Sequence, residues 1–75
     1  MSRAQEQKLL QTFGKCVAQA RKNKGMTQQA LAEATNMSVV AIAYIETGKR
    51  WVRPLTLSKI ASALRVRPAE FFKDL

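Results

Sequence analysis

The chain has 75 residues, of which 47% are hydrophobic, so it is long enough for one small domain over residues 1–75 with a compact core. The 13 Lys and Arg residues against 5 acidic residues give a net charge of +8, which favours a polyanionic partner, either nucleic acid or an acidic membrane surface. A single cysteine excludes an intramolecular disulfide, and no apolar N-terminal run resembles a signal sequence or membrane span, so we expect a cytoplasmic protein.

The first predicted helix begins near Ala4 or Gln5 and runs to Lys24, before Gly25. Apolar residues recur at helical spacing along one side of it, at Leu9, Phe13, Cys16, Val17 and Ala20. Gly14 costs this helix about 1 kcal/mol relative to alanine, which a close helix crossing would explain, although fraying of the first turns is the alternative. Because the chain has no histidine to activate it, Cys16 is interpreted as a small apolar core residue.

Residues 27–47 predict two short helices joined by a tight turn. Thr27 is a good N-cap for the first helix and Ser38 for the second, while Asn36 suits the left-handed backbone of the reversal between them. The inward positions are Leu31, Ala32 and Thr35 on the first helix, and Ala41, Ile42 and Ile45 on the second. Gly48 closes the second helix. This pattern is a helix-turn-helix, whose second helix typically lies in the major groove of DNA.

Two further helices are predicted after the basic loop of residues 49–54. Pro54 disfavours helix at Arg53. Thr56 then caps a fourth helix over residues 57–64, and Pro68 suits the first turn of a fifth helix that continues through Glu70, Phe71 and Phe72. No strand pattern is present, so the predicted fold is all-α, a compact five-helix bundle.

Three runs of residues carry a family resemblance: RKNKGMTQQALAEAT, NMSVVAIAYIETGKR and LTLSKIASAL. From Val17 to Phe72 the chain resembles the phage Cro and lambda-repressor-like helix-turn-helix domains, also called the XRE family. Single-domain phage regulators and the controller proteins of restriction-modification systems are similar in size. The resemblance implies a lambda-repressor-like DNA-binding domain, double-stranded DNA as the partner and a homodimer. Nothing in it implies a cofactor or a metal.

The resemblance also implies roles for individual residues. Gln28 matches a glutamine that holds a DNA phosphate, and Lys49 and Arg50 match basic residues that grip the phosphate backbone. Arg21 and Glu46 match a buried salt bridge between the first and third helices. In the recognition helix, residues 38–47, the positions that face bases and nearby backbone are Ser38, Val39, Val40, Ala43 and Tyr44. We therefore predict DNA contacts from Thr27, Gln28, Gln29, Ser38, Val39, Val40, Ala43, Tyr44, Lys49, Arg50 and Arg53.

The chain departs from the family pattern at three places. Its recognition face lacks the Arg, Gln or Asn side chains that make bidentate base contacts. Val39 and Val40 could instead contact thymine methyl groups, or Val39 could pack under the first helix. Arg65 and Arg67 stand where a glycine and a capping Ser or Asp are usual, and the loop gains apolar bulk from Trp51 and Val52.

The C-terminal apolar residues suggest a dimer contact. Neighbouring helical residues point about 100° apart, so Phe71 and Phe72 cannot fill the same core position. We predict a dimer seam formed by Leu64, Val66, Phe71, Phe72 and Leu75. The alternative is a single closed core with one exposed aromatic ring. A two-fold dimer would place two half-sites one turn of DNA, ~34 Å, apart.

The sequence favours a sequence-specific transcriptional regulator, a dimeric repressor or autoregulator at a short palindromic operator, with no membrane partner and no small-molecule substrate. The alternative is a protein-protein interaction module or an antitoxin that uses the apolar recognition face. An enzyme is the weakest interpretation, because the sequence shows no histidine, no close carboxylate pair on one helix face, no glycine-rich phosphate loop and no metal-ligand cluster.

Overall fold

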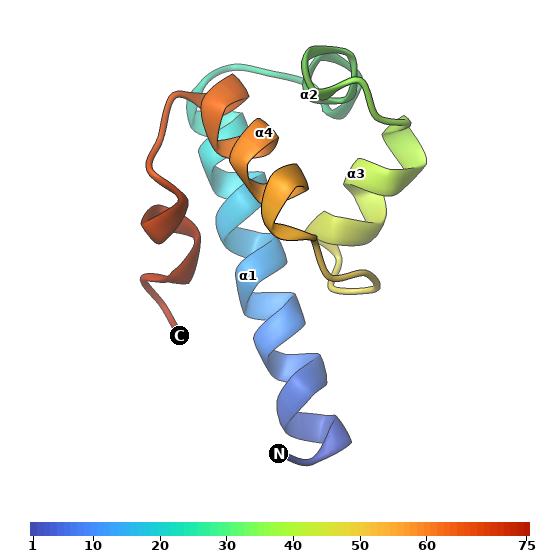
Figure 1. Cartoon of the computed structure of the whole chain (residues 1–75), viewed down its shortest axis with the longest axis vertical. Helices are drawn as coiled ribbons and strands as arrows, with labels where there is room; N and C mark the ends of the chain where they lie inside the picture. Colours follow the sequence, from blue (N-terminus) through green and yellow to red (C-terminus); the bar gives the residue numbers. More distant parts are fainter.

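The computed structural model describes residues 1–75 and contains four α-helices, a final 3₁₀ helix and no strand (Figure 1). The elements are α1 (Arg3–Asn23), α2 (Gln28–Thr35), α3 (Val39–Glu46), α4 (Pro54–Leu64) and the 3₁₀ helix η1 (Pro68–Phe72). In Figure 1, α2, α3 and α4 gather around the C-terminal half of α1, and the C-terminal segment lies along its side. The all-α fold is confirmed. The predicted fifth helix is a 3₁₀ helix of five residues, so the bundle has four α-helices.

The helix starts follow from capping side chains. Ser2 and Gln5 form a capping box, in which each side chain accepts from the backbone N–H of the other, so α1 begins one residue before the predicted range. The hydroxyl of Thr27 accepts from the N–H of Ala30 at 2.9 Å, which fixes the start of α2. Asn36 adopts the left-handed conformation, with φ 57° and ψ 42°, as predicted for the turn.

The fourth helix begins at Pro54, three residues earlier than predicted. Pro54 occupies the first helical position, where its fixed φ is suitable and its missing N–H leaves no bond unmade. Arg53 is the extended N-cap residue and makes no side-chain cap bond, so Thr56 lies inside the first turn. The preference of proline for a helix start therefore outweighs the capping preference of threonine.

The C-terminal end of α4 has a backbone conformation that is usual for a helix end, although the residue there is an arginine. Arg65 has φ 56°, a left-handed conformation that costs a non-glycine residue roughly 1–2 kcal/mol. The N–H groups of Arg65 and Val66 donate to the carbonyl oxygens of Ser62 and Ala61, at 3.2 and 3.0 Å. The connection to η1 thus keeps the usual left-handed turn despite the replacement of glycine.

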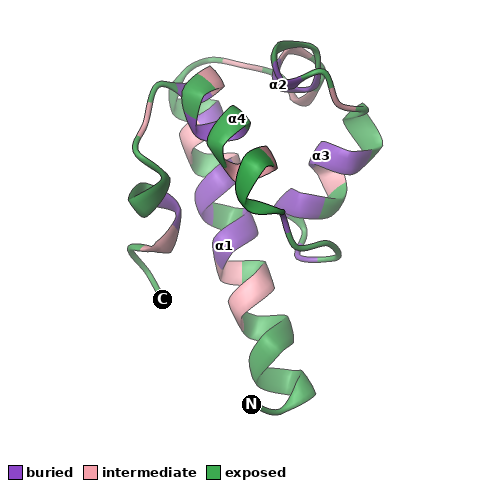
Figure 2. Ribbon diagram, in the orientation of Figure 1, coloured by how far each residue is buried: buried purple, intermediate pink, exposed green.

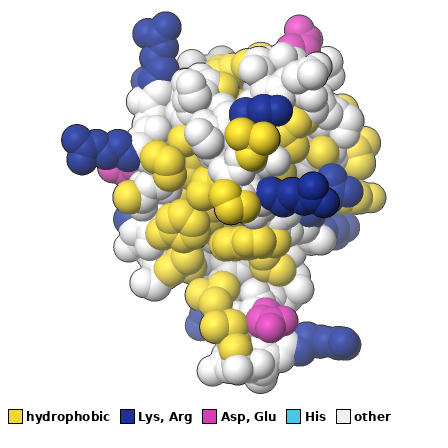
Figure 3. All heavy atoms as spheres, viewed as in Figure 1, with side chains coloured by type: hydrophobic (Ala, Val, Ile, Leu, Met, Phe, Trp, Pro, Cys, Tyr) yellow, Lys and Arg dark blue, Asp and Glu magenta, His cyan; other side chains and the backbone are white.

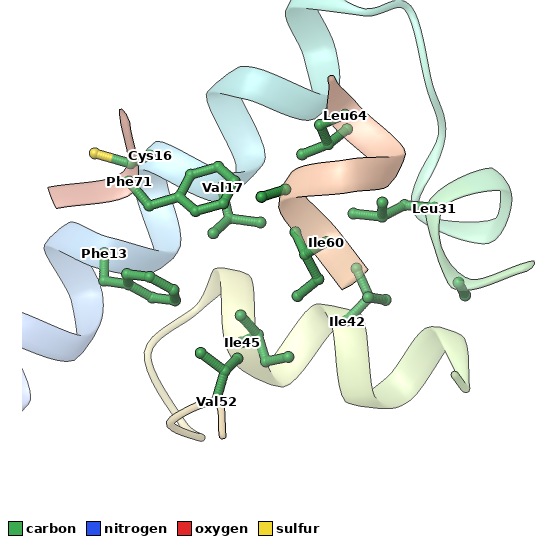
Figure 4. Close-up of a cluster of buried hydrophobic side chains, with 12 residues drawn as sticks. Phe13, Cys16, Val17, Leu31, Ile42, Ile45, Val52, Ile60, Leu64 and Phe71 are labelled. Carbon is green, nitrogen blue, oxygen red and sulfur yellow. The ribbon is translucent and has the colours of Figure 1, made fainter. Parts of the chain in front are cut away.

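The core draws side chains from every helical element (Figure 4). The largest fully buried side chains are Phe13, Val17, Leu31, Ile42, Ile45, Ile60, Leu64 and Phe71. The ring of Phe13 lies at the centre of the aromatic contacts, 5.9 Å from that of Phe71 in an edge-on arrangement and 4.9 Å from that of Trp51. Val52 is also buried, so the apolar loop after α3 closes the core on one side.

Gly14 permits a close crossing of α1 and α3, as its place in the sequence suggested. A methyl group at this position would fall against the backbone carbonyl oxygens of Ile45 and Glu46. At the same crossing the side-chain amide of Gln7 donates to the carbonyl oxygen of Gly48 at 3.1 Å. The recognition helix is therefore anchored directly on the backbone of α1.

The N-terminal turns of α1 extend beyond the bundle and are exposed (Figure 2). No helix of the structure has both the length and the apolar character needed to cross a membrane.

Further along α1, Cys16 is buried and its thiol donates to the Asp74 carboxylate at 3.5 Å. Burial and this hydrogen bond raise the pKa of the Cys16 thiol above its ordinary value, which keeps it protonated and unreactive.

Candidate nucleic-acid interface

The helix α3 is fixed by its inner face and leaves its outer face exposed. Ala41, Ile42 and Ile45 are buried against the bundle. On the opposite side Val40 is 54% exposed and Val39 is 38% exposed. The exposure of Val39 favours contact with a base over packing under α1, because a side chain packed under α1 would be buried. Ser38 and Tyr44 are also exposed and Ala43 is half-buried, so all five predicted groove-facing residues reach the surface.

Three polar side chains of this segment are already engaged within the protein. The hydroxyl of Ser38 accepts from the N–H of Ala41 at 3.0 Å. The hydroxyl of Thr47 donates to the carbonyl oxygen of Ala43 at 2.8 Å. The Glu46 carboxylate is paired with Arg21. The hydroxyl of Tyr44, which has no hydrogen bond within the protein, is the remaining polar side-chain group of α3.

Arg21 and Glu46 form the predicted buried salt bridge. The guanidinium donates to both carboxylate oxygens of Glu46, with N···O distances of 2.7 and 3.1 Å, and to the carbonyl oxygen of Met26 at 2.8 Å. The side-chain amide of Gln28 donates to the same carboxylate at 2.9 Å. Both charged residues are less than a tenth exposed. This network joins the end of α1, the start of α2 and the end of α3.

Gln28 therefore has a structural role that the sequence did not indicate. Its side-chain nitrogen faces Glu46 rather than solvent. Its backbone N–H and that of Gln29 belong to the first turn of α2, where helical amides have no partner within the helix and attract anions. The hydroxyl of Thr27 caps α2, and the side chain of Gln29 donates to Glu33 at 3.3 Å. The start of α2 thus offers backbone amides to a phosphate more directly than side chains.

The basic loop follows α3 immediately. Gly48 makes the turn with φ 77°, and Lys49, Arg50 and Arg53 are all exposed. The Lys49 ammonium and the Arg50 guanidinium each lie 5.8 Å from the centre of the Tyr44 ring, within reach of a cation–π attraction. Two positive charges therefore lie beside Tyr44, near the C-terminal end of the exposed face of α3.

Only some residues of the predicted dimer seam are accessible to a second chain. Leu64 and Phe71 are completely buried in the core, so neither can contact a second chain, and their place in the predicted seam was wrong. The ring of Phe71 packs edge-on against that of Phe13 within the core. Val66 and Phe72 are half-buried and Leu75 is exposed. These three residues remain for such a contact.

A second apolar surface was missed by the sequence analysis. Figure 3 shows apolar side chains that cross one face of the bundle and continue onto the N-terminal part of α1. A shallow groove is lined by the apolar residues Met1, Leu9, Leu10 and Trp51 together with Glu6. The adjacent pair of leucines was the available signal, because neighbouring helical residues cannot both face one core.

Comparisons with known proteins agree with this geometry. Residues 17–71 match the helix-turn-helix family HTH_3. None of the curated proteins matches the chain. Among solved structures, the restriction-modification controller protein C.AhdI from Aeromonas hydrophila is 32% identical with a TM-score of 0.81, over 84% of this chain and 96% of that one.

Two further structures are similar. The clp gene regulator ClgR from C. glutamicum is 28% identical, with a TM-score of 0.81, over 85% of this chain and 83% of that one. The wild-type restriction-modification controller protein C.Esp1396I is 32% identical, with a TM-score of 0.76, over 87% of this chain and 83% of that one. With its fold, its exposed α3 and its match over residues 17–71, the chain belongs to the helix-turn-helix family HTH_3, the XRE family of DNA-binding transcription regulators.

Proposed function

We propose that the protein is a sequence-specific transcriptional regulator that binds a short palindromic operator as a homodimer. In this proposal α3 lies in the major groove, while the amides at the start of α2 and the charges of Lys49 and Arg50 hold phosphates on either side. The observation that carries the proposal is the exposed face of α3 bordered directly by those two cations. The selection of binding sequences from a randomised pool of DNA duplexes tests it, since a palindrome with half-sites about 10 base pairs apart is expected.

Replacing Lys49 and Arg50 together with alanine should weaken DNA binding strongly at near-physiological salt. If each residue neutralises one phosphate in each half-site, a homodimer loses four contacts, and the slope of log K against log salt should fall by about 3.6, at about 0.9 for each contact. The measurement is fluorescence anisotropy of a labelled duplex over a salt series.

The matched control replaces Arg3 and Lys22, which are exposed on α1, outside α3, the basic loop and the C-terminal segment. This double variant loses the same formal charge, so a general loss of positive charge would affect both variants alike. An equal change in slope for the two double variants would contradict the proposed phosphate contacts.

We place the dimer contact at Val66, Phe72 and Leu75, the members of the predicted seam that remain accessible. The ring of Trp51 lies 6.4 Å from that of Phe72, so the exposed indole extends this apolar surface. A Leu75→Asp substitution should introduce a charge into the seam and weaken self-association about tenfold or more, because an unpaired charge in an interface is poorly solvated.

Sedimentation equilibrium measures this effect, with Val40→Asp as the control. Val40 is exposed on α3, away from the C-terminal segment, so its substitution should leave self-association unchanged (Figure 1). A monomeric wild-type protein at high micromolar concentration would refute the dimer. Equal association of all three proteins would refute this placement of the seam.

One observation favours a second candidate function, the docking of a protein on α3. Val39, Val40 and Tyr44 form an apolar exposed face, and contiguous apolar surface tends to mark partner sites. An antitoxin would combine this activity with DNA binding. The Lys49 and Arg50 double variant separates the two, because the loss of two peripheral charges should affect protein docking much less than DNA binding.

A further inference from the structure

The exposed face of α3 presents methyl groups where a recognition helix usually presents hydrogen-bonding side chains. Val40 and Val39 contribute branched aliphatic groups, and Ala43 contributes a single methyl group. At the two ends of the helix, the Ser38 hydroxyl accepts from the N–H of Ala41 and the Thr47 hydroxyl donates to the carbonyl oxygen of Ala43, so each already makes one hydrogen bond to the backbone of the same helix. Apart from the Tyr44 hydroxyl near its C-terminal end, this face therefore offers a base pair van der Waals contact.

An apolar face can detect a methyl group on a pyrimidine, but it cannot distinguish a carbonyl oxygen from an amino group. In the major groove, thymine presents an oxygen acceptor and a C5 methyl group, whereas cytosine presents an amino donor. A side chain without a donor or an acceptor cannot distinguish the oxygen from the amino group, but it gains apolar contact from the methyl group. The same methyl group stands on C5 of 5-methylcytosine and projects into the same groove. For valine side chains, thymine and 5-methylcytosine are equivalent.

We infer that this protein recognises the C5 methyl groups of pyrimidines, so that Val39 and Val40 accept thymine or 5-methylcytosine and disfavour unmodified cytosine. The inference rests on the proposed function, since it requires α3 to lie in the major groove. Its consequence is that occupancy of a site depends on cytosine methylation as well as on base sequence.

The test starts from the duplex enriched by selection from a randomised pool. Each thymine that is fixed in the enriched sequence is rebuilt as uracil, as cytosine or as 5-methylcytosine, with the matching purine on the other strand. Dissociation constants are measured by fluorescence anisotropy at one salt concentration. Removal of a contacted methyl group should weaken binding about fourfold in one half-site and roughly sixteenfold in both. The 5-methylcytosine duplex should bind like the thymine duplex, and the cytosine duplex like the uracil duplex.

A pair of variants assigns the effect to α3. Replacing Val39 and Val40 together with alanine should bring the thymine and uracil duplexes to nearly equal affinity, because the branched methyl groups that contact the bases are gone. Leu55→Ala removes another exposed aliphatic side chain, at the start of α4, and should preserve the difference between the duplexes.

The possible outcomes separate this inference from the proposed function. An enriched site that binds equally with thymine or uracil, or one that contains no fixed thymine, overturns the methyl inference and leaves the regulator intact. Absence of any enriched sequence overturns both. A thymine preference that survives in the double valine variant overturns the role given to those two residues.

Discussion

Replacement of Arg21 with alanine should destabilise the protein by about 3–5 kcal/mol, because it leaves the Glu46 carboxylate buried without its counter-ion. The amide of Gln28 would remain as the one side-chain donor to that carboxylate, and the carbonyl oxygen of Met26 would lose its partner. A domain of this length is stable by roughly 4–11 kcal/mol in total, so the loss is a large fraction of it. Urea denaturation followed by fluorescence of Trp51, which packs on Phe13, measures the change.

Two further variants test whether the loss of stability comes from the buried charge of Glu46. Lys22→Ala removes an exposed positive charge from the adjacent position and should change stability by no more than about 0.5 kcal/mol. The double variant Arg21→Met with Glu46→Leu removes both charges and should recover most of the lost stability, since an apolar pair of similar size often replaces a buried ion pair without cost. A cost below about 1 kcal/mol for Arg21→Ala would show that Glu46 is readily solvated in the native state.

Phe71→Ala should cost about 3–5 kcal/mol and lower the melting temperature by roughly 12 °C or more, because a completely buried ring is removed from a filled core. Its neighbour provides the matched control. Phe72 is only half-buried, although its ring lies 5.3 Å from that of Phe13, so Phe72→Ala should cost clearly less. Thermal unfolding followed by circular dichroism compares the two variants.

The same pair of variants distinguishes the core from the dimer seam. Phe72→Ala should weaken self-association, whereas Phe71→Ala, at a temperature where it remains folded, should preserve it. Equal destabilisation by the two substitutions would mean that the rings share the core. A larger loss of self-association in Phe71→Ala would place that ring at the surface, against the structure described above.

The motif at the centre of the chain was predictable because its signals are local. The caps at Thr27 and Ser38 and the left-handed turn at Asn36 depend on each residue and its nearest neighbours in sequence, and all three are confirmed. The start of α4 was not predicted, because two local preferences competed there. Threonine favours the cap and proline favours the first helical position, and the structure follows Pro54.

The pairing of Arg21 with Glu46 came from a family resemblance, since residues 25 positions apart leave no periodic signal in one sequence. The hydrogen bond from Gln28 to the same carboxylate was missed for a related reason. A glutamine at a helix start looks like a surface residue until a third element brings a buried charge beside it. The groove-facing residues predicted on α3 lie at the surface, whereas the partners of the polar side chains around them had to come from the structure.

By itself, the sequence determined the order of the helical segments, the turn between α2 and α3, and the face of α3 that points outward, because 3.6-residue periodicity and capping act over a few positions. Only the tertiary structure decided which apolar residues are covered. Phe71 is buried and Phe72 is partly exposed, although the ring of Phe13, on α1 far away in sequence, lies close to both of them. Trp51 covers that same ring while half of its indole stays at the surface. Burial depends on how distant elements meet, and a pattern along one helix does not contain that information.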